Sequence, residues 1–204
     1  MARFGRFEVI GMYVSIEGET IIRVPPSGLG GDYSNAVLGV AKETLEGRLV
    51  DTSDNPYNQK KCYIVSVTKT RMVGDGTIVH GDGGVYQTVK YEALAFEPEM
   101  HEIVDGIVVS VKDFGAFVKF GPMEGLLHIS QMMDDRIDID LANQRFVGKD
   151  TKRDLKIGDK VRTKIVLLSL PSSTLDDAKI GLNTKQPWLG KPDWIRLQKQ
   201  AAGA

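Results

Sequence analysis

The second half of the chain is divided into five short runs of strand-like residues, and this feature restricts the possible fold most strongly. The runs cover residues 103–114, 116–120, 126–130, 161–170 and 179–183. Glycines mark turns between them, and a longer polar insertion precedes the fourth run. Five short strands with this punctuation are typical of a small barrel of the OB type. We therefore expect residues 98–186 to form such a barrel.

Alternation within the barrel motif assigns side chains to its two faces. Successive residues of a strand point to opposite sides, so Phe117 and Lys119 share one face while Val118 and Phe120 share the other. A barrel interior takes the more apolar set. We expect Val118 and Phe120 inside the barrel, and Phe117 and Lys119 outside.

Phe114 stands three residues before Phe117, which in a regular strand places the two rings on opposite faces. Gly115 lies between them and permits a bulge that brings both rings to one side. Exposed rings beside cations suit single-stranded nucleic acid, because bases stack on the rings while lysine and arginine contact the phosphates. The alternative is that Phe114 and Phe117 belong to the core, where aromatic residues are common.

Charge does not mark the whole chain as a nucleic-acid-binding protein. Its formal net charge is -1 at pH 7, so any basic surface must be local. In residues 145–164, basic side chains outnumber the acidic Asp150, Asp154 and Asp159; they are Arg145, Lys149, Lys152, Arg153, Lys156, Lys160, Arg162 and Lys164. Such a patch favours phosphate contacts. A solvated loop of mixed charge is the alternative.

The first half, residues 12–97, predicts one helix packed against a small antiparallel sheet. A strand over 19–24 ends at Pro25-Pro26, because proline donates no ladder hydrogen bond. Apolar residues at helical spacing predict a helix over 34–46, capped by Ser34 or Asp32 and followed by Gly47. Further strands are expected over 63–73, 77–79 and 85–96, and a polar loop over 51–61.

Two Gly-Asp-Gly sequences, at 74–76 and 81–83, predict two turns close together and hence a tight hairpin. A phosphate-binding loop is the alternative, but the aspartates would repel an anion and neither sequence matches a P-loop. At the two ends, residues 1–11 are expected to be an extension or to lengthen the first strand, and residues 187–204 to be a tail. Trp188 and Trp194 would pack on a neighbour or on the barrel, with no fixed structure from residue 198 onward.

Cys62 is the single cysteine, which excludes an intramolecular disulfide and a cysteine metal cluster. It begins an apolar run, which predicts a buried structural thiol. A lone thiol fits a reducing, cytoplasmic location. No apolar stretch approaches the roughly 20 residues that span a membrane, and residues 1–11 lack the apolar core of a signal peptide.

The barrel motif carries a family resemblance. The stretches 113–118, 125–130 and 155–161 closely resemble the S1 RNA-binding domain. By this resemblance Phe114, Phe117 and His128 occupy positions that commonly face RNA. Ser169 and Lys179 stand where the family often has aspartate and arginine, and lysine lacks the flat fork of arginine. The predicted RNA-binding residues are Phe114, Phe117, Lys119, His128, Arg162 and Lys179.

The resemblance extends to the first half. Stretches 23–26, 74–86 and 96–98, with 132–135, 148–153 and 186–191, resemble the RNA polymerase stalk subunits that include archaeal E-prime and the seventh subunit of eukaryotic RNA polymerase II. The family implies a heterodimer with F, the helical second polypeptide of the stalk. It also implies attachment to the polymerase core, contact with nascent RNA, and no catalytic residue or cofactor in this chain. The residues it implies for core docking are Gly74, Asp75, Gly76, Gly81, Asp82 and Gly83.

Two other classes compete with this interpretation. One is another S1 protein, such as an exosome cap or a translation initiation factor subunit. An exosome cap would carry a KH-type Gly-x-x-Gly clamp after the barrel, and the initiation factor would begin with its barrel. A hydrolase would need a nucleophile and base, or carboxylates grouped with a histidine. His80, His101 and His128 are scattered, and the acidic stretch 134–140 lacks the spacing of a calcium loop.

Overall fold

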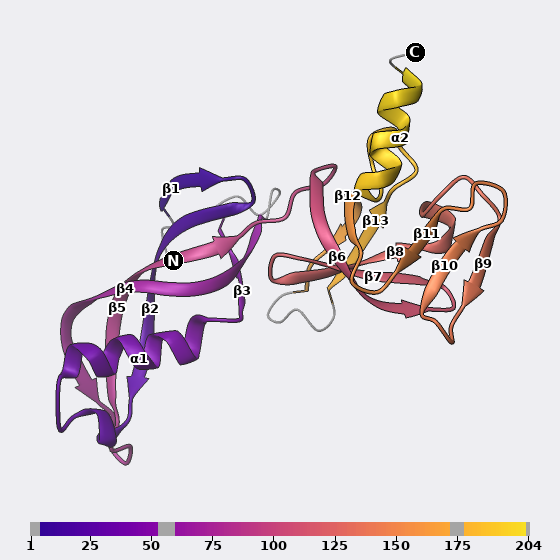
Figure 1. Ribbon diagram of the computed structural model, residues 1–204. Coiled ribbons are helices and arrows are strands. Elements are labelled where there is room, and N and C mark those ends of the chain that lie inside the picture. Colours follow the sequence, from indigo (N-terminus) through magenta and orange to yellow (C-terminus); the bar gives the residue numbers. More distant parts are fainter. Residues whose placement is uncertain (1–4, 53–59, 172–177, 203–204) are drawn as a thin grey trace. The chain divides into compact units, whose positions relative to one another are not determined.

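The computed structural model describes residues 5–52, 60–171 and 178–202. The chain divides into two compact units between residues 97 and 98 (Figure 1). The first combines a helix with an antiparallel sheet and the second is built around a closed barrel, so the predicted fold class is confirmed. Within these described residues, no helix is long and apolar enough to cross a membrane. Most of the loop predicted at 51–61 lies outside the described residues.

The first unit is a five-stranded antiparallel sheet in the order β1-β2-β5-β4-β3. Its elements are β1 (Gly5–Ile10), β2 (Tyr13–Val24), a 3-10 turn at Pro26–Gly28, α1 (Tyr33–Leu45), β3 (Leu49–Asp51), β4 (Lys61–Ile78) and β5 (Val85–Phe96). Residues 5–10 do not lengthen the first strand as one alternative had it. They form a separate strand that turns at Gly11, where φ is +63°, and pairs back on β2.

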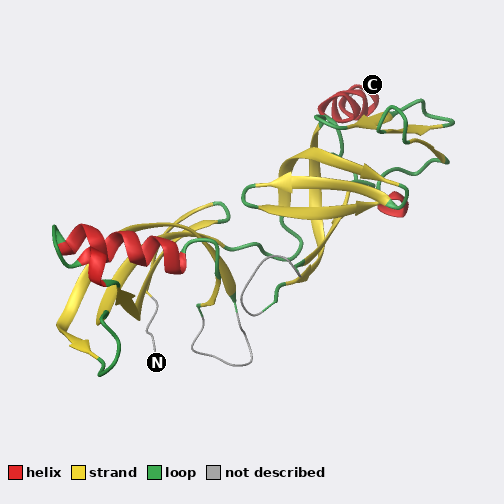
Figure 2. Ribbon diagram, turned by 90° about the horizontal axis from the view of Figure 1, so that it is seen from below, coloured by secondary structure: helices red, strands yellow, loops and turns green. Residues whose placement is uncertain are grey.

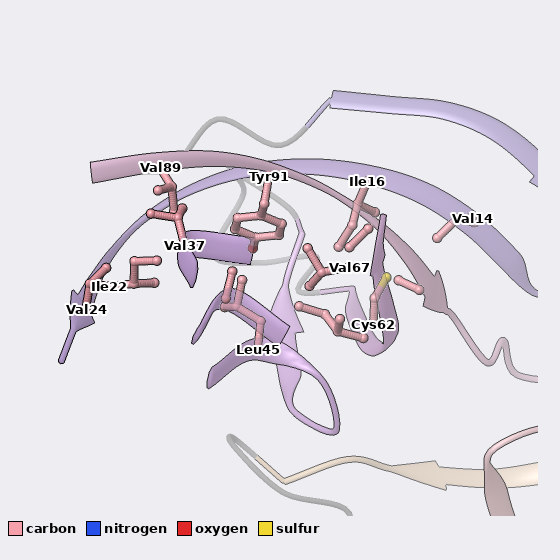
Figure 3. Close-up of a cluster of buried hydrophobic side chains, with 14 residues drawn as sticks. Val14, Ile16, Ile22, Val24, Val37, Leu45, Cys62, Val67, Val89 and Tyr91 are labelled. Atoms are coloured by element: carbon pink, nitrogen blue, oxygen red, sulfur yellow. The ribbon is translucent and has the colours of Figure 1, made fainter. Parts of the chain in front are cut away.

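Helix α1 begins where the sequence predicts, because Asp32 caps it. The carboxylate of Asp32 accepts hydrogen bonds from the backbone N–H groups of Ser34 at 3.0 Å and Asn35 at 3.3 Å. Val37, Ala41 and Leu45 lie on one helical face and are buried against the sheet. Figure 3 shows Val37 and Leu45 of the helix beside labelled side chains of the sheet strands, such as Ile22, Val67 and Tyr91. Cys62 is buried in the same core, as predicted.

The hairpin formed by β4 and β5 differs from the prediction at its first Gly-Asp-Gly sequence. Residues 74–76 form no turn; they lie within β4, whose register against β5 shifts between Val73 and Thr77. The short strand expected at 77–79 is the end of the same long strand. A glycine-rich sequence is compatible with a bulge as well as with a turn, and here it forms a bulge. The reversal occurs only after β4, before Val85.

The second unit contains the predicted barrel. Strands β6 (Ile103–Lys112), β7 (Gly115–Phe120), β8 (Met123–His128), β12 (Lys160–Ser169) and β13 (Lys179–Asn183) close in the order β12-β13-β8-β7-β6. Figure 2 shows the strands of both units in yellow. Neighbouring strands are antiparallel except β8 and β13, which pair in parallel. Val118 and Phe120 are buried inside, as predicted.

The polar insertion forms a structure that the sequence did not predict. After a 3-10 turn at Ile129–Gln131, strands β9 (Ile137–Asp140), β10 (Arg145–Gly148) and β11 (Asp154–Lys156) make a small antiparallel sheet. Asp135 fastens this sheet, since its carboxylate accepts from the hydroxyl of Thr151 at 2.6 Å and from the backbone N–H groups of Thr151 and Asp150. These bonds hold the pKa of Asp135 well below its usual range. The basic region 145–164 therefore belongs to strands and is no single loop.

The tail also corrects the prediction, because residues 192–202 form helix α2 (Pro192–Ala202). Trp194 folds back and is buried, with the guanidinium of Arg153 5.7 Å from its ring centroid. Lys191 donates to the carboxylates of Asp159 at 2.8 Å and Asp154 at 3.3 Å. Burial lowers the pKa of Lys191, but the two carboxylates outweigh it and the pKa is raised. Trp188 stays exposed.

We expect Gly106→Ala to destabilise the barrel. A Cβ at Gly106 would lie 2.6 Å from Cγ1 of Val118 and 2.7 Å from the carbonyl oxygen of Lys119, so β6 and β7 would have to separate. The expected loss is about 1–3 kcal/mol in the free energy of unfolding. Both tryptophans lie in the second unit, so urea unfolding followed by tryptophan fluorescence measures it.

The matched control is Gly39→Ala on the exposed side of α1, where a Cβ would meet nothing within 4 Å. This change should raise the stability of the first unit by about 0.5–1 kcal/mol, because alanine favours a helix interior over glycine. That unit holds no tryptophan, so circular dichroism in the same urea titrations follows it. Equal effects of the two substitutions would contradict the close approach at Gly106.

Candidate nucleic-acid interface and docking hairpin

The two phenylalanines of the barrel motif lie side by side outside the barrel. Phe117 is half-buried on the outer face of β7, and Phe114 is 44% exposed in the two-residue turn that joins β6 to β7. Their ring centroids are 6.2 Å apart at an interplanar angle of 86°, an edge-to-face contact. The turn, and no bulge at Gly115, brings the rings together, because Lys112 pairs with Gly115 in regular register. Neither ring belongs to the buried core.

His128 ends β8 directly across from Gly115, so it lies near the turn that carries Phe114. Its Nδ1 accepts a hydrogen bond from the backbone N–H of Ser130 at 3.1 Å and lies 2.7 Å from the Ser130 hydroxyl. The ring is exposed and its orientation is fixed by these contacts. Nε2 is therefore the ring nitrogen left for a ligand.

Strand register extends the aromatic surface across the barrel with side chains that the sequence did not single out. Phe117 pairs with Leu126 on β8, Leu126 with Gly181 on β13, and Gly181 with Leu167 on β12. Directly paired residues share a face, so these side chains form one outward row. We call Phe114, Phe117, Leu126 and Leu167 the aromatic strip. Leu167 is 54% exposed. The sequence pattern did not identify it as an outward-facing residue, because β12 is irregular between Ile165 and Leu167 and the alternation of faces changes there.

Two of the predicted cations flank the strip. Lys119 follows Phe117 by two residues on β7 and is exposed, and Lys179 lies two residues before Gly181 on the same side of β13. The glycine leaves the middle of the strip without a side chain. The structure thus brings one set of predicted residues to the outer side of β7, β8 and β13, namely Phe114, Phe117, Lys119, His128 and Lys179.

Arg162 lies elsewhere, on the wall formed by β12 and β6. Its guanidinium donates two hydrogen bonds to the carboxylate of Asp105, from Nε at 2.8 Å and from a terminal nitrogen at 2.9 Å. The bonded guanidinium lowers the pKa of Asp105. This bidentate pair occupies the fork that arginine uses to bind phosphate. Arg162 therefore lies apart from the aromatic strip, and its guanidinium is already bonded to Asp105.

At the other predicted site, Asp82 holds the β4–β5 turn together. Its carboxylate accepts from Nε of Arg23 at 2.7 Å, from the Tyr86 hydroxyl at 2.9 Å and from the Gly84 N–H at 3.0 Å, and the second guanidinium nitrogen of Arg23 donates to it as well. These donors, Arg23 above all, hold the pKa of Asp82 far below its usual range. The side chain predicted for docking therefore shapes the turn, and its neighbours are left to make contacts.

The bulge at 74–76 is fixed from within the sheet. The buried side chain of Gln87 donates to the carbonyl oxygens of Val73 at 3.4 Å and Gly74 at 3.2 Å. Gly76 approaches β5 so closely that a Cβ would lie 2.4 Å from Cγ1 of Val85. These contacts explain why glycine stands at positions 74 and 76. Between them, the side chain of Asp75 is exposed and carries the charge of the bulge.

The far half of the hairpin carries apolar side chains that the sequence analysis missed. Strand β4 has 18 residues and α1 has 13. At about 3.3 Å per residue for a strand and about 1.5 Å for a helix, the strand is roughly three times longer than the helix that covers it. The outer half of β4 and the residue after it expose Met72, Val73, Ile78 and Val79, with Ile78 at 69%, whereas Ile22 and Val24 of β2 at the same end of the sheet are buried in the core with α1. The length of the strand-like sequence, compared with that of the predicted helix, was the feature that could have revealed these exposed side chains.

The three histidines of the chain lie far apart in the sequence and on different elements. His80 lies in the hairpin turn, His101 before β6 and His128 at the end of β8. Among the described residues, no cluster of three histidine, cysteine, aspartate or glutamate side chains is placed to hold a metal ion.

We expect Asp82→Asn to lower the melting temperature of the first unit at pH 7. The aspartate is ionised in the folded turn at a pH where the free side chain, with a pKa of about 3.9, takes up a proton. The carboxylate therefore stabilises the fold above pH 4 or so, and this stabilisation is lost progressively at lower pH. Circular dichroism melts at pH 7 and pH 3 measure it.

Asp75→Asn is the control, because this carboxylate is exposed on the same hairpin and the substitution removes the same charge. It should leave the melting temperature nearly unchanged. A loss in Asp82→Asn that is as large at pH 3 as at pH 7 would contradict the role of the ionised carboxylate.

Comparison with known proteins agrees with this arrangement. Residues 97–168 match the family described as S1 RNA binding domain, and residues 19–83 match the SHS2 domain found in the N terminus of Rpb7p/Rpc25p/MJ0397. The chain is 29% identical to DNA-directed RNA polymerase subunit Rpo7 of Sulfolobus acidocaldarius, over 92% of this chain and 97% of that protein. The Saccharolobus shibatae Rpo7 is equally similar, at 29% over 93% and 100%. DNA-directed RNA polymerase II subunit rpb7 of Dictyostelium discoideum is 30% identical over 62% of this chain and 72% of its own length. The chain therefore belongs to the Rpo7/Rpb7 family of DNA-directed RNA polymerase subunits.

Proposed function

We propose that this protein is a non-catalytic stalk subunit of a DNA-directed RNA polymerase, acting in transcription. It docks on the polymerase core through the first unit and contacts nascent single-stranded RNA through the barrel. The observation that carries this proposal is the similarity to Rpo7 across both units, over 92% of the chain. An S1 barrel alone occurs in proteins of other classes. Here it is combined with a match to the SHS2 domain that is found in the N terminus of Rpb7p/Rpc25p/MJ0397, and this combination supports the family's role.

The β4–β5 hairpin has the properties that a docking element needs. Its exposed end carries Ile78 and Val79 beside the turn and Met72 and Val73 before the bulge. Exposed apolar side chains gathered on one element mark protein-protein contact sites. The hydrogen bonds to Asp82 hold the turn in one shape before binding, which reduces the ordering cost of association.

The aromatic strip has the properties of a surface for single-stranded RNA. Two rings and two leucines offer flat apolar area for bases, while Lys119 and Lys179 offer charge for phosphates. Lysine is a point charge without arginine's fork, and Ser169, paired with Lys179, adds no carboxylate. We therefore propose contact that is modest in affinity and tolerant of sequence, as suits a transcript of any sequence.

Family membership also indicates the partners. We propose a heterodimer with the helical F polypeptide of the stalk, attachment of that pair to the polymerase core, and a cytoplasmic location. Nucleotide transfer belongs to other subunits in this proposal. A pull-down from native extract, with identification of the bound proteins, tests it. Recovery of a helical partner together with large polymerase subunits is expected, and reproducible recovery of exosome or translation factors instead would overturn it.

Substituting Phe117 and His128 by alanine, singly and together, should weaken RNA binding while the fold stays intact. Loss of one stacking ring removes about 1–3 kcal/mol, which is roughly a 5- to 150-fold rise in Kd for an oligonucleotide. Fluorescence anisotropy with oligo-uridylate at low salt measures it. Leu141→Ala removes exposed apolar area from the insertion and is the control. Unchanged affinity in the double variant would refute the aromatic strip as the RNA site.

Shortening residues 74–84 should abolish docking on the core polymerase. The substitutions Ile78→Ser and Val79→Ser should weaken it without shortening the chain, because they remove apolar contact area from the exposed end of the hairpin. Co-purification with core subunits measures both. Leu141→Ser is the matched control outside the hairpin. Normal co-purification of the shortened protein would count decisively against the hairpin.

A further inference from the structure

A groove runs along the second unit between helix α2 and the barrel wall of β6 and β12. Its volume is about 810 Å³, within the range of sites that hold ligand or peptide side chains. The floor is aliphatic and includes Ile107, Val109, Pro192 and Ile195. Ile107 is 45% exposed and Val109 37%, although both belong to barrel strands. Apolar side chains here remain open to an incoming partner.

The groove is already formed in the free protein, because α2 is fixed to the barrel at its start. Arg162 and Gly190 exchange backbone hydrogen bonds of 2.9 Å and 2.8 Å. Gly190 has φ +103° and lies against the ring of Trp194, where a Cβ would come within 2.5 Å. With the ion pairs of Lys191, these contacts fix the first turn of α2 against β12. A rigid groove binds without an ordering cost of its own.

Positive charge surrounds the aliphatic floor. Five basic side chains and one acidic side chain line the groove: Lys119, Lys160, Arg162, Arg196 and Lys199, with Asp105. Arg162 and Asp105 satisfy each other. Within the described residues, Lys119, Lys160 and Lys199 have no carboxylate within ion-pair distance, and Arg196 meets only the exposed Asp193 at 3.6 Å. The rim therefore offers unneutralised cations to a ligand.

The lining favours a protein segment over RNA. None of the described residues that line the groove is aromatic, so bases would find no ring to stack on. The arginine fork best suited to phosphate is occupied by Asp105. Aliphatic side chains in the floor instead match the apolar residues of a peptide, and the lysines match its carboxylates.

We propose that this groove docks an acidic segment of a partner protein, with apolar side chains seated on Ile107, Val109 and Ile195 and carboxylates paired with Lys160, Arg196 and Lys199. The groove shares Lys119 with the edge of the aromatic strip, but none of Phe114, Phe117, Leu126 and Leu167, and no residue of the β4–β5 hairpin, is among the described residues that line it. It therefore adds a third contact surface, and the proposed stalk role stands or falls independently of it.

The test uses the full chain and a set of fluorescent 16-residue synthetic peptides. Each carries glutamates with leucine and phenylalanine, spaced for either a helix or a strand, and a matching peptide has glutamine in place of every glutamate. Anisotropy measures binding, and methyl NMR of the isoleucines and valines locates it. At least one acidic peptide should bind, shift the methyl signals of Ile107, Val109 and Ile195, and bind more weakly as salt increases.

The double variant Lys160→Glu with Lys199→Glu should weaken peptide binding by about 10-fold or more, since each reversal replaces attraction by repulsion. Lys42→Glu with Lys149→Glu is the control, because both lysines are exposed, neither lines the groove and the net charge changes equally. Melting curves followed by circular dichroism verify that each variant keeps its fold.

Three outcomes would overturn the proposal. The first is that no acidic peptide binds, and the second is that the glutamine peptide binds as well as its acidic parent. The third is that oligo-uridylate, and no peptide, shifts the groove methyls and loses affinity in the groove variant. That result would make RNA the occupant. RNA binding that depends on Phe117 but is unaffected by the groove variant leaves the aromatic strip intact, so the two surfaces are distinguished.

Discussion

Parallel pairing of β8 with β13 closes the barrel, and the surfaces of the second unit depend on this closure. The last strand reaches β8 because glycines permit close approach. A Cβ at Gly125 would lie 2.8 Å from the Leu182 side chain, and one at Gly181 would lie 2.9 Å from Cβ of Leu167. Closure sets Leu167 in register with Phe117 through two intervening strands, so residues far apart in the chain form one strip. The same closure places β12 beside β6, and that wall supports α2.

A different constraint governs the first unit. A helix advances less than half as far per residue as a strand, so a short helix cannot cover a long hairpin. The core beneath Val37, Ala41 and Leu45 of α1 includes Ile22 and Val24 of β2 and Val89 of β5, but β4 leaves it after Val67 and its outer half is exposed. The exposed outer half of β4 would be unfavourable in a free sheet. In the hairpin, Asp82 holds the turn and Gln87 holds the bulge through hydrogen bonds to the backbone. An exposed apolar end with internally satisfied polar groups is what a pre-formed docking element requires.

The sequence predicted both folds, the positions of most strands and the outward direction of Phe117. Local rules were sufficient there: alternation places Val118 inside, and Asp32 caps α1. Predictions failed where distant contacts decide. Residues 74–76 form a bulge because Gln87 on the neighbouring strand donates to the carbonyls of Val73 and Gly74. Helix α2 forms because Trp194 contacts Arg153 and Lys191 pairs with Asp154 and Asp159, all between β10 and β12. Leu167 was missed because an irregularity in β12 changes which residues face outward.

The near-zero net charge of the chain is compatible with locally basic surfaces because several carboxylates are bonded within their own unit. Asp82, Asp105 and Asp135 each have a depressed pKa caused by hydrogen bonds inside their own unit. A carboxylate bound in this way holds the fold and neutralises a neighbour, and it contributes little repulsion to an approaching anion. Lys119, Lys160 and Lys199 are left without such partners in the described structure. The distribution of pairing, more than the sum of charges, therefore sets which surfaces attract negatively charged ligands.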